Sequence, residues 1–332
     1  MTIYDIAEKA GVSITTVSRV LNGKENVNAK TRAHILAVLE ECGYTPNRLA
    51  QGLASKATKT IGVMAVDIRD IHHSTIAYQV EQTLSTLGYS SILCNFSGNK
   101  NRLPDYLDML FSRQVDGFIF IGSVFAGDFC RGELASRLDG SKPTVFINGT
   151  PSLPGAYCVI EQEEDAMKRA VEYLYHQCDR RHIAFVGMGD TASERSKRKG
   201  YEAAVDSLGL TAHTAITAQS LAGGESAVSS LLDTHPSLDA LVFTDDITAC
   251  GGVRRLLQIG RSVPGDIAVV GFNNSLYSEI CIPSLTSIDN RMYETGKIAA
   301  GILADALEGR EPEAVVSVGC QLVIRDSTGI RI

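Results

Sequence analysis

The sequence lacks any apolar run that approaches the roughly 20 residues needed to span a bilayer. Its N-terminus also lacks the basic segment followed by an apolar core that marks a secretory signal. These absences predict a cytoplasmic protein with no membrane partner. At 332 residues, 44% of them hydrophobic, the chain can bury sizeable cores and is long enough for more than one domain.

Cysteine pairs with metal-ligand or redox spacing are also missing. The eight cysteines are spread singly along the chain: Cys42, Cys94, Cys130, Cys158, Cys178, Cys250, Cys281 and Cys320. We expect reduced and mostly buried thiols. The adjacent His72 and His73 predict no metal site, because neighbouring side chains on a loop rarely converge on one ion. No metal or cofactor is therefore expected.

A catalytic constellation is absent as well, with no Gly-x-Ser-x-Gly and no recognisable Cys–His or paired-carboxylate arrangement. The segment Gly187-Met188-Gly189-Asp190-Thr191-Ala192 follows an apolar run and matches the G-x-G-x-x-A form of a dinucleotide-binding fingerprint. However, it lies in mid-chain, and no distinct acidic residue ends a following strand about twenty positions on. We predict that the protein is not an enzyme. A nicotinamide enzyme and a secreted sugar-binding protein are the alternatives.

Charge is unevenly divided along the chain, whose net charge is −7. Residues 1–59 hold eight basic and five acidic residues, a net of +3. The remainder holds 23 basic and 33 acidic residues, a net of −10. A small basic head on an acidic body fits a DNA reader attached to another domain.

The head is predicted to be a bundle of three short helices. Apolar residues recur at helical spacing within residues 3–10, 14–21 and 35–42, and Gly11 separates the first two segments. Outside the apolar face, the second segment carries Thr15, Thr16, Ser18, Arg19 and Asn22. These short hydrogen-bonding side chains and one Arg suit a surface that approaches base edges and phosphates. Residues 47–56 form at most a short helix without a core, which would need a partner.

From residue 60, short apolar runs alternate with amphipathic segments. Strands are expected over 61–66, 91–96, 117–121, 144–147, 183–186, 240–243, 267–272 and around 322–325, and helices around 75–87, 104–114, 165–178, 195–208, 225–234, 247–259 and 293–308. This alternation predicts an α/β body of two doubly wound, parallel-sheet lobes beside the small all-α head. Ligands of such sheets bind at the carboxyl ends of the strands, which here predicts a site between the lobes.

These motifs resemble those of the LacI/GalR family of bacterial transcriptional regulators. The segments Tyr4-Asp5-Ile6-Ala7, Ala10-Gly11-Val12-Ser13 and Thr16-Val17-Ser18-Arg19-Val20-Leu21-Asn22 match the family's helix-turn-helix signature, Gly43-Tyr44-Thr45-Pro46-Asn47 its hinge, and Val269-Val270-Gly271-Phe272 its body. The resemblance covers essentially the whole chain. It implies a helix-turn-helix domain (1–45), a hinge (46–59) and a periplasmic-binding-protein-like body (60–332). The lobes of the body are expected at about 60–156 plus 290–318, and about 157–289 plus 319–332.

The resemblance also implies a dimer on a pseudo-palindromic operator. No leucine-heptad tail follows the last expected strand, so we expect a homodimer rather than a tetramer. The resemblance places Ile14, Thr15 and Arg19 at base-reading positions. Other DNA contacts are implied at Tyr4, Thr16, Ser18, Asn22, Asn26, Thr31, Asn47, Ala50 and Leu53, the last as a minor-groove wedge. Ile14 as a core residue, Arg19 as a solvated charge and Leu53 as a plain interface residue are the alternatives. Repression is the usual mode of the family, and activation stays open.

In the body, the resemblance implies a small-molecule effector, sugar-like, that controls DNA binding from the interlobe cleft. The expected contacts are Asp67, His72, Ser123, Asn148, Arg195, Lys197, Asp245 and Asn273. Lys197 stands where the family commonly has Arg, and Asn148 and Asn273 stand where Asp is frequent. The loss of two negative positions would ease the entry of an anionic ligand such as a sugar acid or sugar phosphate, and a neutral sugar held by other groups is the alternative.

Overall fold

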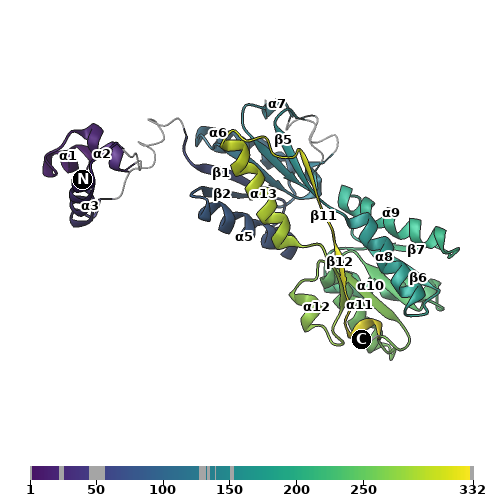
Figure 1. The fold of residues 1–332 in the computed structure, drawn as a ribbon. Coiled ribbons are helices and arrows are strands. Elements are labelled where there is room, and N and C mark those ends of the chain that lie inside the picture. Colours follow the sequence, from purple (N-terminus) through teal and green to yellow (C-terminus); the bar gives the residue numbers. More distant parts are fainter. Residues whose placement is uncertain are drawn as a thin grey trace. The chain divides into compact units, whose positions relative to one another are not determined.

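The structure is a computed structural model that describes residues 2–21, 26–44, 57–126, 132, 135–138, 140–149 and 153–329. It divides into two compact units, Met1–Lys59 and Thr60–Ile332, which are described separately below (Figure 1). No helix within these ranges is both long and apolar enough to cross a membrane.

The first unit is the expected bundle of three helices, α1 (Ile3–Lys9), α2 (Ile14–Leu21) and α3 (Ala29–Glu41). Each helix has a side-chain cap, which satisfies backbone N–H groups that the helix itself leaves unpaired. Thr2 and Asp5 form a capping box on α1, Ser13 Oγ accepts from the backbone of Thr16 at 3.2 Å, and Asn28 caps α3. The three helices bury one shared core: Ile6, Ala7, Ala10, Val17, Val20, Ile35, Val38 and Leu39.

The second unit contains two six-stranded sheets. The first has the order β11-β5-β4-β3-β1-β2, and all its neighbours are parallel. Its strands are β1 (Thr60–Ala65), β2 (Ser90–Asn95), β3 (Gly117–Ile121), β4 (Thr144–Ile147), β5 (Ala156–Glu161) and β11 (Val315–Val318). The second has the order β12-β10-β9-β8-β6-β7, and only β12 is antiparallel to its neighbour. Its strands are β6 (Ile183–Gly187), β7 (His213–Ile216), β8 (Ala240–Phe243), β9 (Ala268–Phe272), β10 (Thr286–Asp289) and β12 (Gln321–Val323).

Helices cover both faces of each sheet, as buried parallel strands require (Figure 1). The first lobe carries α5 (Ile71–Thr86) and α13 (Met292–Leu307) on one face and α6 (Leu103–Ser112) on the other. A short helix, α7 (Ala135–Arg137), also follows β3. The second lobe carries α8 (Glu163–His176) and α9 (Ala192–Ser207) on one face. Its other face carries α10 (Leu221–Thr234) and α11 (Asp246–Gln258), with α12 (Leu276–Ile280) against α11. The predicted two-lobed α/β body is confirmed.

Three expectations about this unit are wrong. β5 pairs within the first sheet, so the chain leaves the first lobe after Glu161 and not near residue 156. The strands β5, β7, β10 and β11 were not predicted. β7 and β11 lie at or near a sheet edge, and with their alternating exposure they have no continuous apolar run. Residues 70–73 are not a loop: Asp70 caps α5 by accepting from the His72 backbone at 2.8 Å, and the histidines form its first turn.

Candidate functional site

The helix α2 presents to solvent the side chains predicted to read DNA. Val17 and Val20 face the core, whereas Thr15 and Arg19 are exposed. Ile14 is 40% exposed, so the alternative that it belongs to the core is wrong. The hydroxyl of Thr16 lies 2.8 Å from that of Ser13, within the cap of the helix. The exposed face therefore matches the surface expected of a recognition helix.

The structure describes only some of the other residues that are predicted to contact DNA. Tyr4 is 67% exposed, Asn26 is exposed, and Ser18 and Thr31 are half-buried. These four belong to the same small unit as α2, and their contacts with DNA remain predictions. The remaining predicted contacts lie outside the described residues: Asn22, Asn47, Ala50 and Leu53.

In the second unit, two adjoining cavities of about 250 and 410 Å³ lie between the lobes. Both are lined by Val66, Asp70, His73, Gln219 and Asn273. The lining residues follow the carboxyl ends of β1, β3, β4, β6, β8 and β9, which is where ligands bind in parallel sheets.

Seven of the eight predicted effector contacts line this cleft: Asp67, His72, Ser123, Asn148, Lys197, Asp245 and Asn273. The expectation for Arg195 is wrong, because it lines neither cavity. Two residues before Lys197 on α9, Arg195 points about 200° around the helix from it. It lies over the exposed Asp190, to whose backbone oxygen it donates at 2.6 Å.

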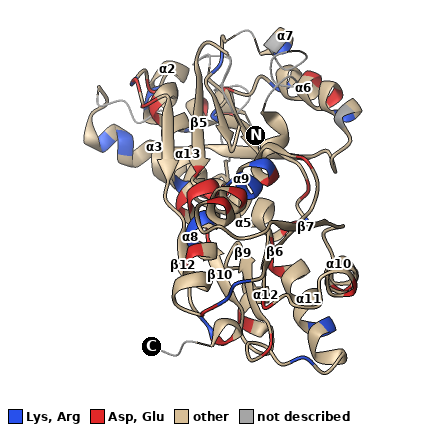
Figure 2. Ribbon diagram, turned by 90° about the vertical axis from the view of Figure 1, so that its right-hand side faces the viewer, with Lys and Arg blue, Asp and Glu red and all other residues tan. Residues whose placement is uncertain are grey.

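Lys197 is buried at the centre of a carboxylate cluster. Its Nζ lies 3.4 Å from Glu163 and 4.0 Å from Glu194, and it donates to the backbone oxygen of Thr244 at 3.2 Å. Burial lowers the pKa of Lys197, but Glu163, Glu194 and Glu161 outweigh burial and raise the pKa above its usual value. Lys197 is therefore charged and held by the protein's own carboxylates. Figure 2 shows that α8 and α9, which pack against each other, both carry basic and acidic residues.

A second buried pair joins His72 to Glu161. The imidazole Nε2 lies 3.2 Å from Glu161 Oε2, which also accepts from Asn148 and Asn290 at 3.0 Å. Burial lowers the pKa of His72, but the Glu161 charge outweighs it and the net shift is upward. Burial raises the pKa of Glu161, but the same pair outweighs it and the net shift is downward. Both shifts favour the ion pair, in which Glu161 supplies the carboxylate that Asn148 lacks.

The neighbouring His73 has a different partner. Its Nδ1 lies 3.5 Å from Asp70 Oδ2, and burial lowers the pKa of His73. The adjacent histidines thus lie beside two different carboxylates, Glu161 and Asp70. In the part of the chain that the structure describes, no group of three or more His, Cys, Asp or Glu side chains could hold a metal ion.

The sequence interpretation missed Glu161, Glu163, Glu194 and Gln219. Glu161 is the last residue of β5, a strand that was not predicted, and Glu163 is the first residue of α8, where acidic residues are typical of a solvated helix start. Glu161, Glu163 and Glu194 are each at most 4% exposed. Because Glu163, Glu194, Asp70 and Asp245 line the cleft, the premise that it has lost negative charge is wrong.

The glycine-rich segment after β6 does not form a phosphate cradle. Glu194 Oε2 accepts from the Met188 backbone at 2.8 Å, so a carboxylate fills the position that a pyrophosphate would need. A Cβ at Gly187 would lie 2.7 Å from the Phe185 ring, so this glycine serves packing. The dinucleotide alternative therefore has no support from the geometry.

Comparison with known proteins agrees with these features. Residues 2–47 match the model for bacterial regulatory proteins of the lacI family, and residues 171–328 match that for a periplasmic binding protein-like domain. An HTH-type transcriptional regulator of Lachnoclostridium phytofermentans is 34% identical over 99% of both chains. Catabolite control protein A of Priestia megaterium is 30% identical over 99% of both chains.

Solved structures give the same result. The lac repressor dimer bound to operator and the anti-inducer ONPF has a TM-score of 0.89 and 26% identity over 99% of both chains. The complex of the transcriptional regulator CelR with cellobiose has a TM-score of 0.72 and 25% identity over 98% of this chain and 99% of that one. The chain therefore belongs to the lacI family of bacterial regulatory proteins, which are DNA-binding transcriptional regulators and not enzymes.

Proposed function

We propose that this regulator binds a pseudo-palindromic operator as a homodimer and represses transcription there. In this proposal residues 1–45 read DNA, 46–59 are the hinge, and a sugar-like molecule in the cleft of residues 60–332 controls the affinity. The observation that carries it is the joint presence of an exposed recognition surface on α2 and a polar interlobe cleft in the second unit.

The proposed base contacts are Ile14, Thr15 and Arg19, which are exposed on α2. Arg19 is expected to contribute most, because Arg donating two hydrogen bonds to guanine is the commonest specific contact in the major groove. The lac repressor in its operator complex is a dimer, which supports the same assembly here.

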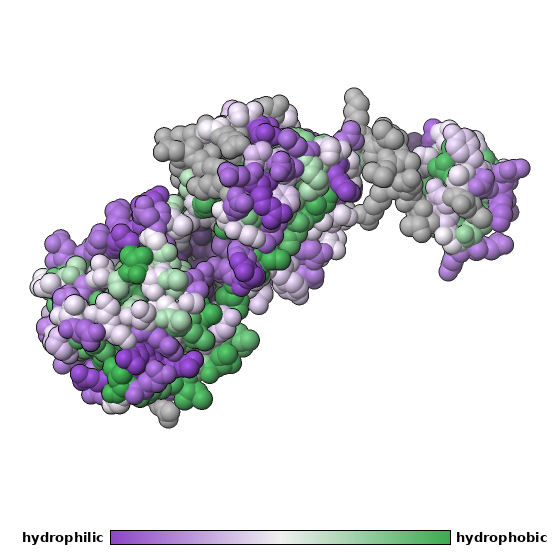
Figure 3. All heavy atoms as spheres, turned by 180° about the vertical axis from the view of Figure 1, so that it is seen from behind, coloured by the Kyte–Doolittle hydropathy of each residue, from purple (hydrophilic) through white to green (hydrophobic). Residues whose placement is uncertain are grey.

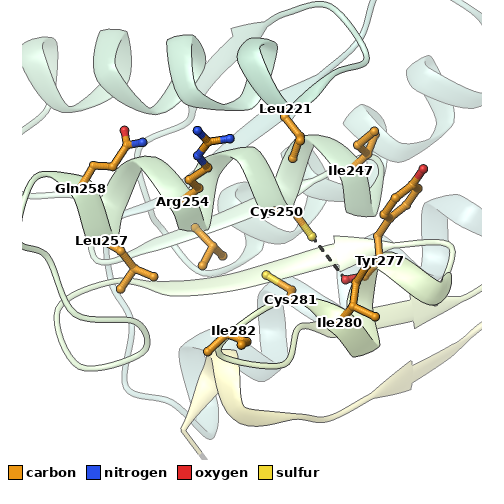
Figure 4. A pocket seen from close by; sticks show the side chains of 11 residues that line it. Leu221, Ile247, Cys250, Arg254, Leu257, Gln258, Tyr277, Ile280, Cys281 and Ile282 are labelled. Atoms are coloured by element: carbon orange, nitrogen blue, oxygen red, sulfur yellow. Dashed lines mark hydrogen bonds between the residues drawn. The ribbon is translucent and has the colours of Figure 1, made fainter.

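The proposed dimer would also bury an apolar groove of about 720 Å³ between α11 and α12. Figure 4 shows its lining residues, among them Ile280 and Ile282, which are 62% and 83% exposed. A smaller apolar cavity of about 340 Å³ lies against α5 and β2 in the first lobe and includes the exposed Tyr78 and Leu93. Figure 3 shows apolar residues along one edge of the body, over both lobes. Exposed apolar patches of this kind mark association surfaces, and a second copy of the chain is the occupant we propose.

The proposed effector binds in the cleft, because bound hydroxyl groups would find polar partners from both lobes there. Asn148 and Ser123 come from the first lobe, and Asn273 and Thr244 from the second. A ligand that contacts both lobes favours one interlobe arrangement, and it shifts DNA binding only by the difference in its affinity for the two arrangements.

Selection of genomic fragments that the full-length protein retains, followed by footprinting, tests this proposal. We expect inverted repeats, protected by two chains per site as measured by mass photometry. A reporter downstream of such a site should be more active when the protein is absent. Retention of fragments without a shared sequence, or binding by a single chain, would refute the operator and dimer parts. Lower reporter activity in its absence would show activation instead.

A further inference from the structure

Two aspartates on opposite sides of the cleft each cap the N-terminus of a helix with one carboxylate oxygen, which leaves the other oxygen available. Asp70 of the first lobe uses Oδ1 to cap α5 by accepting from the His72 backbone at 2.8 Å. Asp245 of the second lobe uses Oδ1 to cap α11 by accepting from the Thr248 backbone at 2.8 Å. The second oxygens of both side chains are therefore not needed for capping.

The two remaining oxygens differ in their hydrogen bonding. Asp70 Oδ2 accepts from the amide nitrogen of Gln219 at 3.1 Å. Asp245 is 2% exposed, and its buried Oδ2 has no hydrogen-bond partner among the described residues. Burial raises the pKa of Asp245 and the charge of Asp70 adds to this, while Thr248 and the nearby amide of Gln219 lower it, and the net shift is upward. A buried carboxylate oxygen without a donor is costly, so this position favours a donor brought by a ligand.

The cations that line the cleft among the described residues are engaged elsewhere. Lys197 is held by Glu163 and Glu194, and His72 pairs with Glu161. In the cavity of about 410 Å³, Arg69 donates to both oxygens of Asp67, at 3.0 Å from Nε to Oδ1 and 2.5 Å from Nη2 to Oδ2. His73 has a lowered pKa and so brings little charge to Asp70 at neutral pH. No side-chain cation in this lining therefore neutralises Asp245.

Four carboxylates line the cavity of about 410 Å³, and the fourth, beside Asp67, Asp70 and Asp245, is Asp246. Asp246 accepts from the backbone and hydroxyl of Ser275 at 2.7 Å and from the hydroxyl of Ser287 at 2.6 Å. Both its oxygens are thus used within the second lobe. Asp70 and Asp245 remain as the pair that line one cavity of about 410 Å³ from both lobes, together with Gln219.

We propose that the effector carries a protonated amine that lies between Asp70 and Asp245, and that it is an amino sugar or a similar polyhydroxylated amine. An ammonium group has three N–H donors, which suits the two carboxylate oxygens and the carbonyl of Gln219. Hydroxyl groups of the same molecule would bind Ser123, Asn148 and Asn273 in the adjoining cavity. This inference rests on the proposed effector site. It replaces the hypothesis of an anionic ligand that the sequence suggested, because an anion would face the uncompensated carboxylates.

Calorimetry on the full-length protein with matched sugars tests the inference. The probes are glucosamine, galactosamine and mannosamine, each with its neutral parent sugar and the corresponding uronic acid. We expect at least one amino sugar to bind about tenfold or more tightly than its parent, and the uronic acids to bind least well. Such a preference is of the size that a charge-assisted hydrogen bond provides. Tightest binding by a neutral sugar or uronic acid, binding of magnesium or calcium alone at the same site, or no binding by any amino sugar would overturn it.

The variants Asp245→Asn and Asp70→Asn identify the site. Asn also caps helices, so both variants remove the charge and keep the cap. We expect the preference for the amino sugar over its parent to fall about tenfold in each, with the parent's affinity little changed. Asp190→Asn, which removes an exposed carboxylate paired with Arg195, is the control and should keep the preference. An unchanged preference in Asp245→Asn overturns the inference.

Operator affinity separates failure of this inference from failure of the proposed function. If a neutral sugar binds the cleft and changes operator affinity while amines do not, the amine inference fails and the effector-controlled regulator stands. If amino sugars bind with the expected preference and leave operator affinity unchanged, the amine site stands and effector control through it fails.

Discussion

The amide nitrogen of Gln219 donates to Asp70 Oδ2 at 3.1 Å, and this hydrogen bond joins the second lobe to the first across the cleft. Gln219 precedes α10, and Asp70 caps α5. Because the bond exists only when the lobes are close, it favours the closed arrangement before any ligand binds. The Gln219–Asp70 hydrogen bond is thus a weak contact between the lobes that needs no ligand. It lies beside the position proposed for the amine.

Gln219→Ala should open the cleft in the absence of ligand. A hydrogen bond to a charged acceptor contributes about 1.5–3 kcal/mol when fully formed, and partial exposure reduces this figure. We expect a larger radius of gyration in small-angle X-ray scattering and effector binding that is several-fold weaker. Gln82→Ala on the exposed face of α5 is the control and should change neither quantity. Unaltered scattering and affinity in Gln219→Ala would show that the bond does not hold the lobes.

Lys197→Met should strongly destabilise the second unit. The substitution leaves Glu163 and Glu194 buried without their cation, and breaking a buried ion pair in this way costs about 3–5 kcal/mol. The matched control lies two residues on: Lys199 pairs with Glu164 on the surface, and Lys199→Met should cost at most about 1 kcal/mol. Denaturant unfolding of both variants measures the difference. Equal losses would mean that the central cluster contributes no more than a surface pair.

Glu161→Gln should lower the pKa of His72. Burial alone lowers this pKa, and the Glu161 charge reverses the shift in the wild type. NMR titration of the imidazole should therefore give a value above 6.5 in the wild type and below it in the variant. Glu164→Gln, at an exposed position, should leave the His72 titration unchanged. A wild-type value below 6.5 would contradict the ion pair.

The same pair predicts how stability depends on pH. Because folding raises the pKa of His72, its contribution is complete below the unfolded value of about 6.5 and declines as the pH rises through the folded value. Glu161 has a lowered pKa, so its contribution is present above its unfolded value of about 4.5 and declines as the pH falls through the folded value. The stability difference between wild type and Glu161→Gln should therefore be largest between about pH 4.5 and 6.5. A difference that grows steadily toward pH 8 would contradict this assignment.

Leu53→Ala should weaken operator binding and leave effector binding intact. Leu53 lies outside the described residues, and the family resemblance alone assigns it the wedge position in the minor groove. Fluorescence anisotropy with operator DNA and calorimetry with the effector measure the two affinities. Leu49→Ala is the comparison, because composition does not distinguish the two leucines. Equal operator affinity in Leu53→Ala and the wild type would remove this residue from the proposed mechanism.

Local sequence patterns were sufficient to predict the helices of residues 1–45 and most strands and helices of residues 60–332. In α2, the helical repeat places Val17 and Val20 inside, which leaves Arg19 outside, and the structure agrees. Continuous apolar runs identified β3 and β9, because strands buried on both faces have no polar alternation.

Long-range contacts account for what the sequence could not predict. The buried carboxylate of Glu161 is paired with His72, 89 positions away in the chain. The buried carboxylate of Glu163 is paired with Lys197 on the neighbouring helix. Nothing within a few residues of either glutamate reports these partners. Asp245 was predicted as an effector contact from its place after β8, but its unpaired oxygen and its relation to Asp70 depend on how the two lobes meet. The chemistry of the cleft therefore required the tertiary structure.

The affinity of the full-length protein for a selected genomic site, measured by fluorescence anisotropy against scrambled DNA of the same length and salt, tests the central claim most directly. The account predicts that the selected site binds roughly a thousandfold or more tightly than the scrambled one. In Arg19→Ala the ratio of the two affinities should fall by about five- to 150-fold, which corresponds to the loss of one bidentate base contact. Addition of the effector should change the affinity for the selected site and leave that for scrambled DNA nearly constant. Equal affinity for both DNAs, or an Arg19→Ala variant as selective as the wild type, would contradict the account.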